Sequence, residues 1–84
     1  MVEQRVEIYL APCKRDGREE DVYDKIGMHA RLVGIKSPAI VVGNPFHSEF
    51  DYAVERLEDG QARNLVDAIN KLEGFCAKAV DWIA

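Results

Sequence analysis

Hydrophobic and polar positions alternate near the start of the chain. In QRVEIYLAP, residues 4–12, Val6, Ile8 and Leu10 share one face and polar side chains occupy the other. A period of two over this length predicts a strand that is buried on one side. Pro12 ends the pattern, because proline lacks the N–H group that a strand ladder uses.

Toward the end of the chain the period becomes helical. Residues 61–83 repeat apolar side chains at spacings of three and four, which predicts one long amphipathic helix with Cys76 in the core. Gly74 would weaken this helix by about 1 kcal/mol relative to alanine. The repeated positions are Leu65, Ile69, Leu72, Cys76, Ala79 and Ile83.

Residues 28–43 are mostly apolar, and Ser37-Pro38 interrupts them as a turn. We therefore expect two strands, at 29–36 and 39–43. The second is apolar on both faces, which is typical of a central strand, because an exposed edge of this composition invites aggregation.

The segment before these strands can be interpreted in two ways. Residues 13–25 carry nine charged side chains, as a solvated loop would. Alternatively, Val22 and Ile26 could anchor a short helix over residues 18–26, because side chains four apart share a helix face.

The segment after them is also ambiguous. Residues 46–57 fit a helix that begins at Asn44, and they equally fit a strand over residues 50–57. We favour the strand, because Glu58-Asp59-Gly60 would then turn the chain into the next helix with Asp59 as its N-cap.

The predicted architecture is a single α+β domain over residues 1–84. It consists of a three- to four-stranded, mainly antiparallel sheet with one long C-terminal helix packed on one face. Short connections between the last strands favour antiparallel neighbours.

Composition and charge narrow the functional classes. The chain has 84 residues, is 48% hydrophobic and 31% charged, and carries a net charge of −4, which fits a soluble globular protein. The basic residues are scattered and the net charge is negative, so we do not expect direct nucleic-acid binding. No apolar run reaches the roughly 18 residues that span a bilayer, and the N-terminus does not resemble a signal peptide. We expect a cytoplasmic protein without a membrane partner, located in the host cytoplasm if it is viral.

Cofactors, metals and catalysis have little support. The glycines form no phosphate-binding motif, and on a strand Ser48 would point away from His47, so no catalytic residue is assigned. His47, Glu49 and Asp51 could face a metal together, but alternation on a solvent face produces this spacing by default. Two cysteines, Cys13 and Cys76, cannot complete a four-ligand zinc site, and whether they form a disulfide stays open. We expect neither enzymatic activity nor a cofactor.

Acidic residues gather after residue 48, where the segment 49–59 has a net charge of −4. An ordinary solvated face, a guard against edge-to-edge strand pairing and a docking surface for a basic partner all explain such a group. The candidate partner-binding residues are Glu49, Asp51, Glu55, Glu58 and Asp59.

The predicted C-terminal helix carries a second apolar stripe. A helix lying on one sheet need not bury two stripes, so the second either wraps into the same core or forms a dimer interface. The candidate interface residues are Ala68, Leu72, Phe75, Ala79 and Trp82.

These observations predict a small, non-enzymatic protein-binding module that forms homodimers. In one concrete version it is an inhibitor, for example phage-encoded, that docks on a basic surface of a target protein through the acidic residues. The alternative is a homo-oligomer that binds a small anionic ligand in a pocket between subunits, with His29, Arg31 and Lys36 as candidate contacts.

Overall fold

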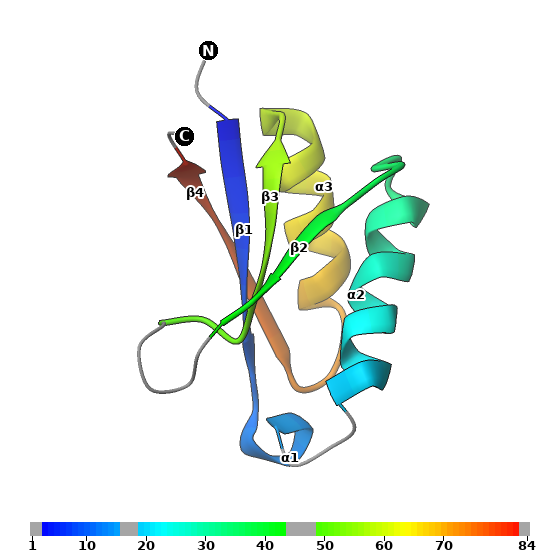
Figure 1. Ribbon diagram of the computed structural model, residues 1–84, viewed down its shortest axis with the longest axis vertical. Coiled ribbons are helices and arrows are strands. Elements are labelled where there is room, and N and C mark those ends of the chain that lie inside the picture. The colour runs from blue at the N-terminus through cyan, green and yellow to red at the C-terminus, as the bar shows by residue number, and fades with distance from the viewer. Residues whose placement is uncertain (1–2, 16–18, 44–48, 83–84) are drawn as a thin grey trace.

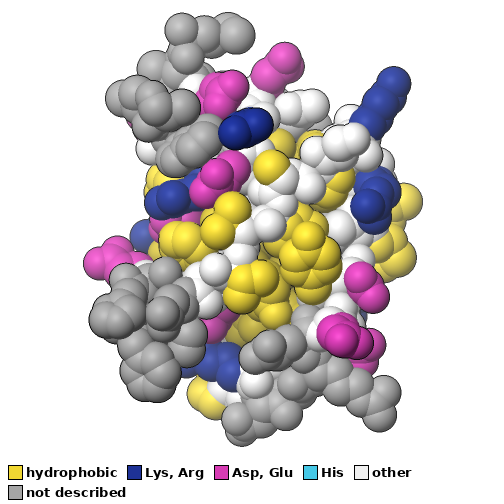
Figure 2. Space-filling model, viewed as in Figure 1, with side chains coloured by type: hydrophobic (Ala, Val, Ile, Leu, Met, Phe, Trp, Pro, Cys, Tyr) yellow, Lys and Arg dark blue, Asp and Glu magenta, His cyan; other side chains and the backbone are white. Residues whose placement is uncertain are grey.

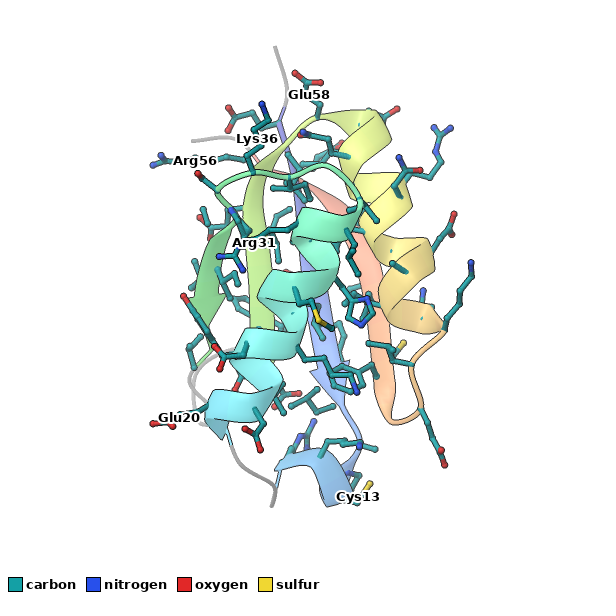
Figure 3. The ribbon with its side chains drawn as sticks, turned by 90° about the vertical axis from the view of Figure 1, so that its right-hand side faces the viewer. Cys13, Glu20, Arg31, Lys36, Arg56 and Glu58 are labelled. Atoms are coloured by element: carbon teal, nitrogen blue, oxygen red, sulfur yellow. The ribbon has the colours of Figure 1, made fainter. Side chains whose placement is uncertain are left out.

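The protein is described by a computed structural model that covers residues 3–15, 19–43 and 49–82. Within these residues, four strands form one antiparallel sheet, and helices α2 and α3 lie on the same face of it (Figure 1, Figure 3). The α+β class and the antiparallel sheet are therefore confirmed. The elements in chain order are β1 (Glu3–Leu10), α1 (Pro12–Arg15), α2 (Glu19–Leu32), β2 (Ala39–Val42), β3 (Tyr52–Leu57), α3 (Asp59–Asn70) and β4 (Phe75–Trp82).

The strands lie in the order β2-β3-β1-β4, so β1 and β3 are central and β2 and β4 are at the edges. With the one-turn helix α1 set aside, the chain follows the β-α-β-β-α-β order of the ferredoxin-like, split β-α-β topology. This fold class supports many unrelated functions, so it indicates no activity by itself.

The core lies between the sheet and the two long helices. Val6 and Ile8 of β1 are fully buried, as their alternation predicted, and they pair with Val54 and Tyr52 of β3. Ile26 of α2 lies in the same buried cluster. Burial of each such aliphatic side chain contributes about 1.5–3 kcal/mol, so this cluster dominates the stability of the fold.

Helix α2 replaces the strand that was predicted at 29–36. Val22, Ile26 and Ala30 are buried at a spacing of four, so one helix face covers the sheet. The short helix suggested for residues 18–26 was therefore correct in kind, but it continues for two further turns.

Exposed apolar side chains explain why this strand prediction was wrong. Met28 and Leu32 are exposed on α2, so the apolar run does not mark a buried strand. The helix ends before Gly34, whose φ of 95° is unfavourable for residues with a Cβ atom. Across this glycine the N–H of Ile35 donates to the carbonyl oxygen of Ala30 at 3.0 Å, which is a Schellman-type helix end.

The single long C-terminal helix was also wrong. Helix α3 has 12 residues, and residues 75–82 form strand β4 instead. Gly74 separates the two elements with a φ of 85°. Its carbonyl oxygen accepts a hydrogen bond of 2.9 Å from the N–H of Ala11, which fixes the turn beside the end of β1.

Burial along β4 follows the period of a strand. Phe75 and Ala77 are buried, whereas Cys76 between them is exposed. The prediction that Cys76 belongs to the core is therefore wrong. Cys13 is exposed as well, and both thiols are free.

The strands predicted at 39–43 and 50–57 are present as β2 and β3. However, β2 is an edge strand rather than the predicted central one. The N-cap of α3 is Glu58 rather than Asp59, and its N–H donates to Oε1 of Gln61 at 3.1 Å.

A bulge lies near the end of β3. Val6 pairs with Val54 but Gln4 pairs with Leu57, so β3 carries one extra residue there. Arg56 has a φ of 60°, the left-handed conformation that accommodates such a residue. The bulge lets both Val54 and Leu57 face the core, although three positions separate them.

Candidate functional site

The edge formed by β2 is unusually apolar. Its sequence is AIVV, and the side chains of Val41 and Val42 are 37% and 60% exposed. Proteins commonly protect an edge strand with charged residues, prolines or bulges within the strand. None of these devices interrupts residues 39–42.

The hydrogen bonds of β2 show which of its backbone groups face outward. The N–H of Gly43 donates to the carbonyl oxygen of Asp51 at 2.9 Å, so Gly43 faces β3. Backbone groups alternate between the two sides of an antiparallel strand, so Val41 also faces β3. The N–H and C=O groups of Ile40 and Val42 therefore point away from the sheet.

The opposite edge, β4, is protected. The Asn70 side chain of α3 accepts a hydrogen bond from the N–H of Ala77 at 2.7 Å and donates one to its carbonyl oxygen at 3.1 Å. This amide occupies the N–H and C=O groups of Ala77, which a neighbouring strand would otherwise use. Lys78 and Asp81 also place charges along β4, so β2 is the more open of the two edges.

A groove of about 420 Å³ lies between α2 and the β2 edge. Val42 and Tyr52 contribute from the sheet, while Glu20, Tyr23 and Asp24 contribute from α2. Figure 2 shows hydrophobic side chains gathered at the centre of this face, with acidic side chains at the lower right and basic ones at the upper right.

Charge is separated along this edge. Glu20 lies at one end, whereas Arg31, Lys36 and Arg56 lie toward the other end (Figure 3). A Cβ atom built on Gly27 would be 3.3 Å from Nη1 of Arg31, so the guanidinium group lies across the side of α2 that faces β2. The edge is therefore a dipolar surface with an apolar centre.

A second cluster lies on the sheet face opposite the helices. Glu7 is only 7% exposed, and it accepts hydrogen bonds from Nη2 of Arg5 at 2.6 Å and from the hydroxyl of Tyr9 at 2.8 Å. Nζ of Lys78 is 3.9 Å from Oε1 of Glu7 and lies 5.3 Å from the centre of the Tyr9 ring. These contacts compensate the charge of a carboxylate that is mostly removed from water.

The pKa shifts in this cluster favour a structural role. Burial and the hydrogen bond to Glu7 raise the pKa of Tyr9 above 10.0. The hydrogen bond to Tyr9 raises the pKa of Lys78 above 10.5. Both groups therefore stay protonated near neutral pH, whereas an acid–base catalyst needs a pKa near the working pH.

The five candidate partner-binding acids do not form one patch. Glu49 precedes β3 and Glu58 follows it, so the six-residue strand, about 20 Å long, separates the two ends of the group. Asp51 is partly structural, because Oδ2 accepts a hydrogen bond from the N–H of Leu10 at 2.9 Å. Its Oδ1 lies 3.2 Å from Nε of Arg15.

Two more of these acids also have arginine partners. Glu55 is 3.9 Å from Nη1 of Arg5, and Asp59 is 3.4 Å from Nη2 of Arg63. These pairs reduce the local excess of negative charge, although exposed pairs such as Asp59–Arg63 are worth at most about 1 kcal/mol. Docking of a basic partner on these five residues stays a prediction.

The five candidate interface residues also come from different elements. Ala68 lies on α3, Leu72 in the following turn, and the other three on β4. Phe75 belongs to the buried core of this chain. The helical stripe on which this interface was predicted is therefore absent, because residues 75–82 form a strand.

The residues proposed for a small ligand separate as well. His29 and Arg31 lie on α2, where positions two apart face different directions, rather than on one strand face. Lys36 lies in the connection to β2. His47, the candidate metal ligand, is outside the described residues, and among those that are described no three His, Cys, Asp or Glu side chains are placed to share a metal ion.

Comparison with known proteins gives no relative: no family model, curated protein or solved structure matches this chain. None of the helices in the described part of the chain has the length and apolar character that crossing a bilayer requires.

Sequence reasoning missed the β2 edge. Four apolar residues suggested a buried strand, whereas the brevity of β2 and the adjacent Pro38 and Gly43 are the signals that fit an edge.

Proposed function

We propose that this protein is a non-enzymatic protein-binding module that pairs strand β2 with an extended segment of another polypeptide. The observation that carries the proposal is the contrast between the two sheet edges. Asn70 occupies backbone groups of β4, whereas the outward groups of Ile40 and Val42 adjoin apolar side chains and a groove.

Strand addition also suggests what the bound segment looks like. The outward N–H and C=O groups give affinity through main-chain hydrogen bonds, and alternate side chains of the segment give specificity. A side chain of the partner would enter the groove beside Tyr23, where Glu20 and Asp24 favour a lysine or arginine, carried either by the segment itself or by an element packed beside it. Occupation of a target's strand in this way is one means by which a small protein inhibits it.

Selection from a library of short random peptides tests this proposal. Immobilised protein should enrich peptides that alternate apolar residues and carry a basic side chain. Val42→Pro should abolish their binding, because proline removes an outward N–H group while edge positions of this kind tolerate it. Val42→Thr is the matched control, since threonine keeps both the N–H group and the branched shape.

Binding that survives Val42→Pro would contradict strand addition at β2. Circular dichroism of each variant must show an unchanged fold, so that a loss of binding reports the edge and not unfolding.

A further inference from the structure

We infer that the segment bound at β2 is strand β2 of a second copy of this chain. This inference rests on the proposed function, because it names the partner for the same edge. The two copies would pair antiparallel about a twofold axis and join their sheets into one, with both α2 helices on the same side.

The alternation of side chains restricts the register. Residues directly opposite in an antiparallel pair lie on the same sheet face, so Ile40 must meet Ile40 or Val42 of the second copy. In the first case Pro38 would lie opposite Val42, and its missing N–H would leave part of the ladder unpaired. In the second case Val41 lies opposite Val41 at the axis.

The second register uses the outward backbone groups. Ile40 and Val42 point away from β3, so each Ile40–Val42 pair across the axis exchanges two hydrogen bonds. The symmetry makes two such pairs, which gives four hydrogen bonds. The exposed side chain of Val42 then lies beside Ile40 of the second copy, where it loses contact with water.

The charges along the edge match this arrangement. The groove places Glu20 and Asp24 beside Val42, whereas Arg31 lies near Ile40, since both approach the Cβ position of Gly27. The twofold axis brings the Val42 end of one copy to the Ile40 end of the other. The acidic end of each α2 therefore faces the basic end of its counterpart, as a self-complementary interface requires.

Light scattering coupled to size exclusion gives the first test. The wild-type chain at high micromolar concentration should have twice the 9.5 kDa mass of one chain. Val42→Pro should give monomers, and Val42→Thr should remain dimeric. A monomeric wild-type chain, or a Val42→Pro dimer, would overturn the inference.

Charge reversal tests the register without altering β2. One variant combines Glu20→Lys with Asp24→Lys, and the other combines Arg31→Glu with Lys36→Glu. Each should be monomeric alone, because like charges then meet across the axis, whereas an equimolar mixture should recover the dimer mass.

A matched control combines Asp67→Lys with Glu73→Lys. These two exposed residues lie on α3 and in the turn after it, and their reversal changes the net charge as much as the Glu20/Asp24 variant does. The control should remain dimeric. Failure of the mixture to form dimers would refute the antiparallel register.

The peptide selection separates the two proposals. A monomeric wild-type chain whose peptide binding is lost in Val42→Pro would keep strand addition and eliminate the second copy as partner. A monomeric chain with no Val42-sensitive binding would eliminate both.

Discussion

Replacement of Asn70 by alanine should destabilise the protein and uncover the β4 edge. The side chain makes two hydrogen bonds to the backbone of Ala77, at 2.7 and 3.1 Å. At about 0.5–1.5 kcal/mol each, their loss costs roughly 1–3 kcal/mol. Alanine is the better helix former by about 0.5 kcal/mol, which offsets part of this loss. We therefore expect the free energy of unfolding to fall by about 1.5 kcal/mol.

Urea denaturation followed by circular dichroism measures this change. For a chain of this size the midpoint should fall by about 1 M. The matched control is Asn64→Ala, because Asn64 is exposed on the same helix and this change carries the same gain in helix propensity.

A second measurement tests the cause. Hydrogen exchange at the Ala77 amide should accelerate in Asn70→Ala, because its acceptor is gone. Equal free energies of unfolding for the Asn70 and Asn64 variants would refute the idea that Asn70 secures this edge.

Three further predictions concern the backbone and the polar cluster. Gly43→Ala should lower the free energy of unfolding by more than about 2 kcal/mol, because the new Cβ would lie 2.0 Å from the carbonyl oxygen of Phe50. Gly60→Ala is the control: a Cβ there meets nothing within 4 Å, so urea denaturation should show no loss of stability. The free energy of unfolding should hold below pH 10 and fall as the pH rises through the raised folded-state pKa of Tyr9, because this tyrosine ionises first in the unfolded chain. Tyr9→Phe should reduce the loss at alkaline pH, measured as the change of the urea midpoint with pH. At Arg56, whose φ is 60°, thermal unfolding should show valine to be less stable than glycine by about 1–2 kcal/mol, and equal stabilities would contradict a strained bulge.

The sequence correctly predicted those elements whose pattern of buried side chains does not depend on where the element lies in the fold. The alternation of Val6, Ile8 and Leu10 predicted β1, because a strand packed on one side shows this period wherever it lies in a sheet. The same holds for Leu65 and Ile69, whose spacing of four predicted a helix. Both lie on α3, which corresponds to the first half of the predicted C-terminal helix.

The errors came from patterns that fit two periods. Phe75 and Ala79 are four apart, as on a helix, but they are also alternate positions of a strand. Pairing of Phe75 with Leu10 of β1 decides between the two, and that partner is distant in sequence. Gly74, interpreted as a weak point of a helix, is the turn that makes the pairing possible.

The candidate sites show the same limit. Asp51 and Glu55 were identified as acidic residues, but no pattern along the chain indicated that Arg15 and Arg5 would lie beside them. The net charge of the segment 49–59 therefore overestimated the uncompensated negative charge on the surface. Glu20 and Arg31 lie on one helix, α2, but the sequence predicted a strand over residues 29–36 and, only as an alternative, a short helix over residues 18–26, so their arrangement along one helix was not foreseen.

Local sequence thus determined the α+β class, the half-buried strand β1 and the start of α3, because side-chain periodicity follows from backbone geometry alone. Tertiary structure decided the strand order, which turned the apolar segment at 39–42 from a predicted central strand into an exposed edge. A strand's neighbours depend on how distant segments cross the sheet, and residues within the strand do not encode that path. For this reason the edge that carries the proposed binding function became visible only in the folded chain.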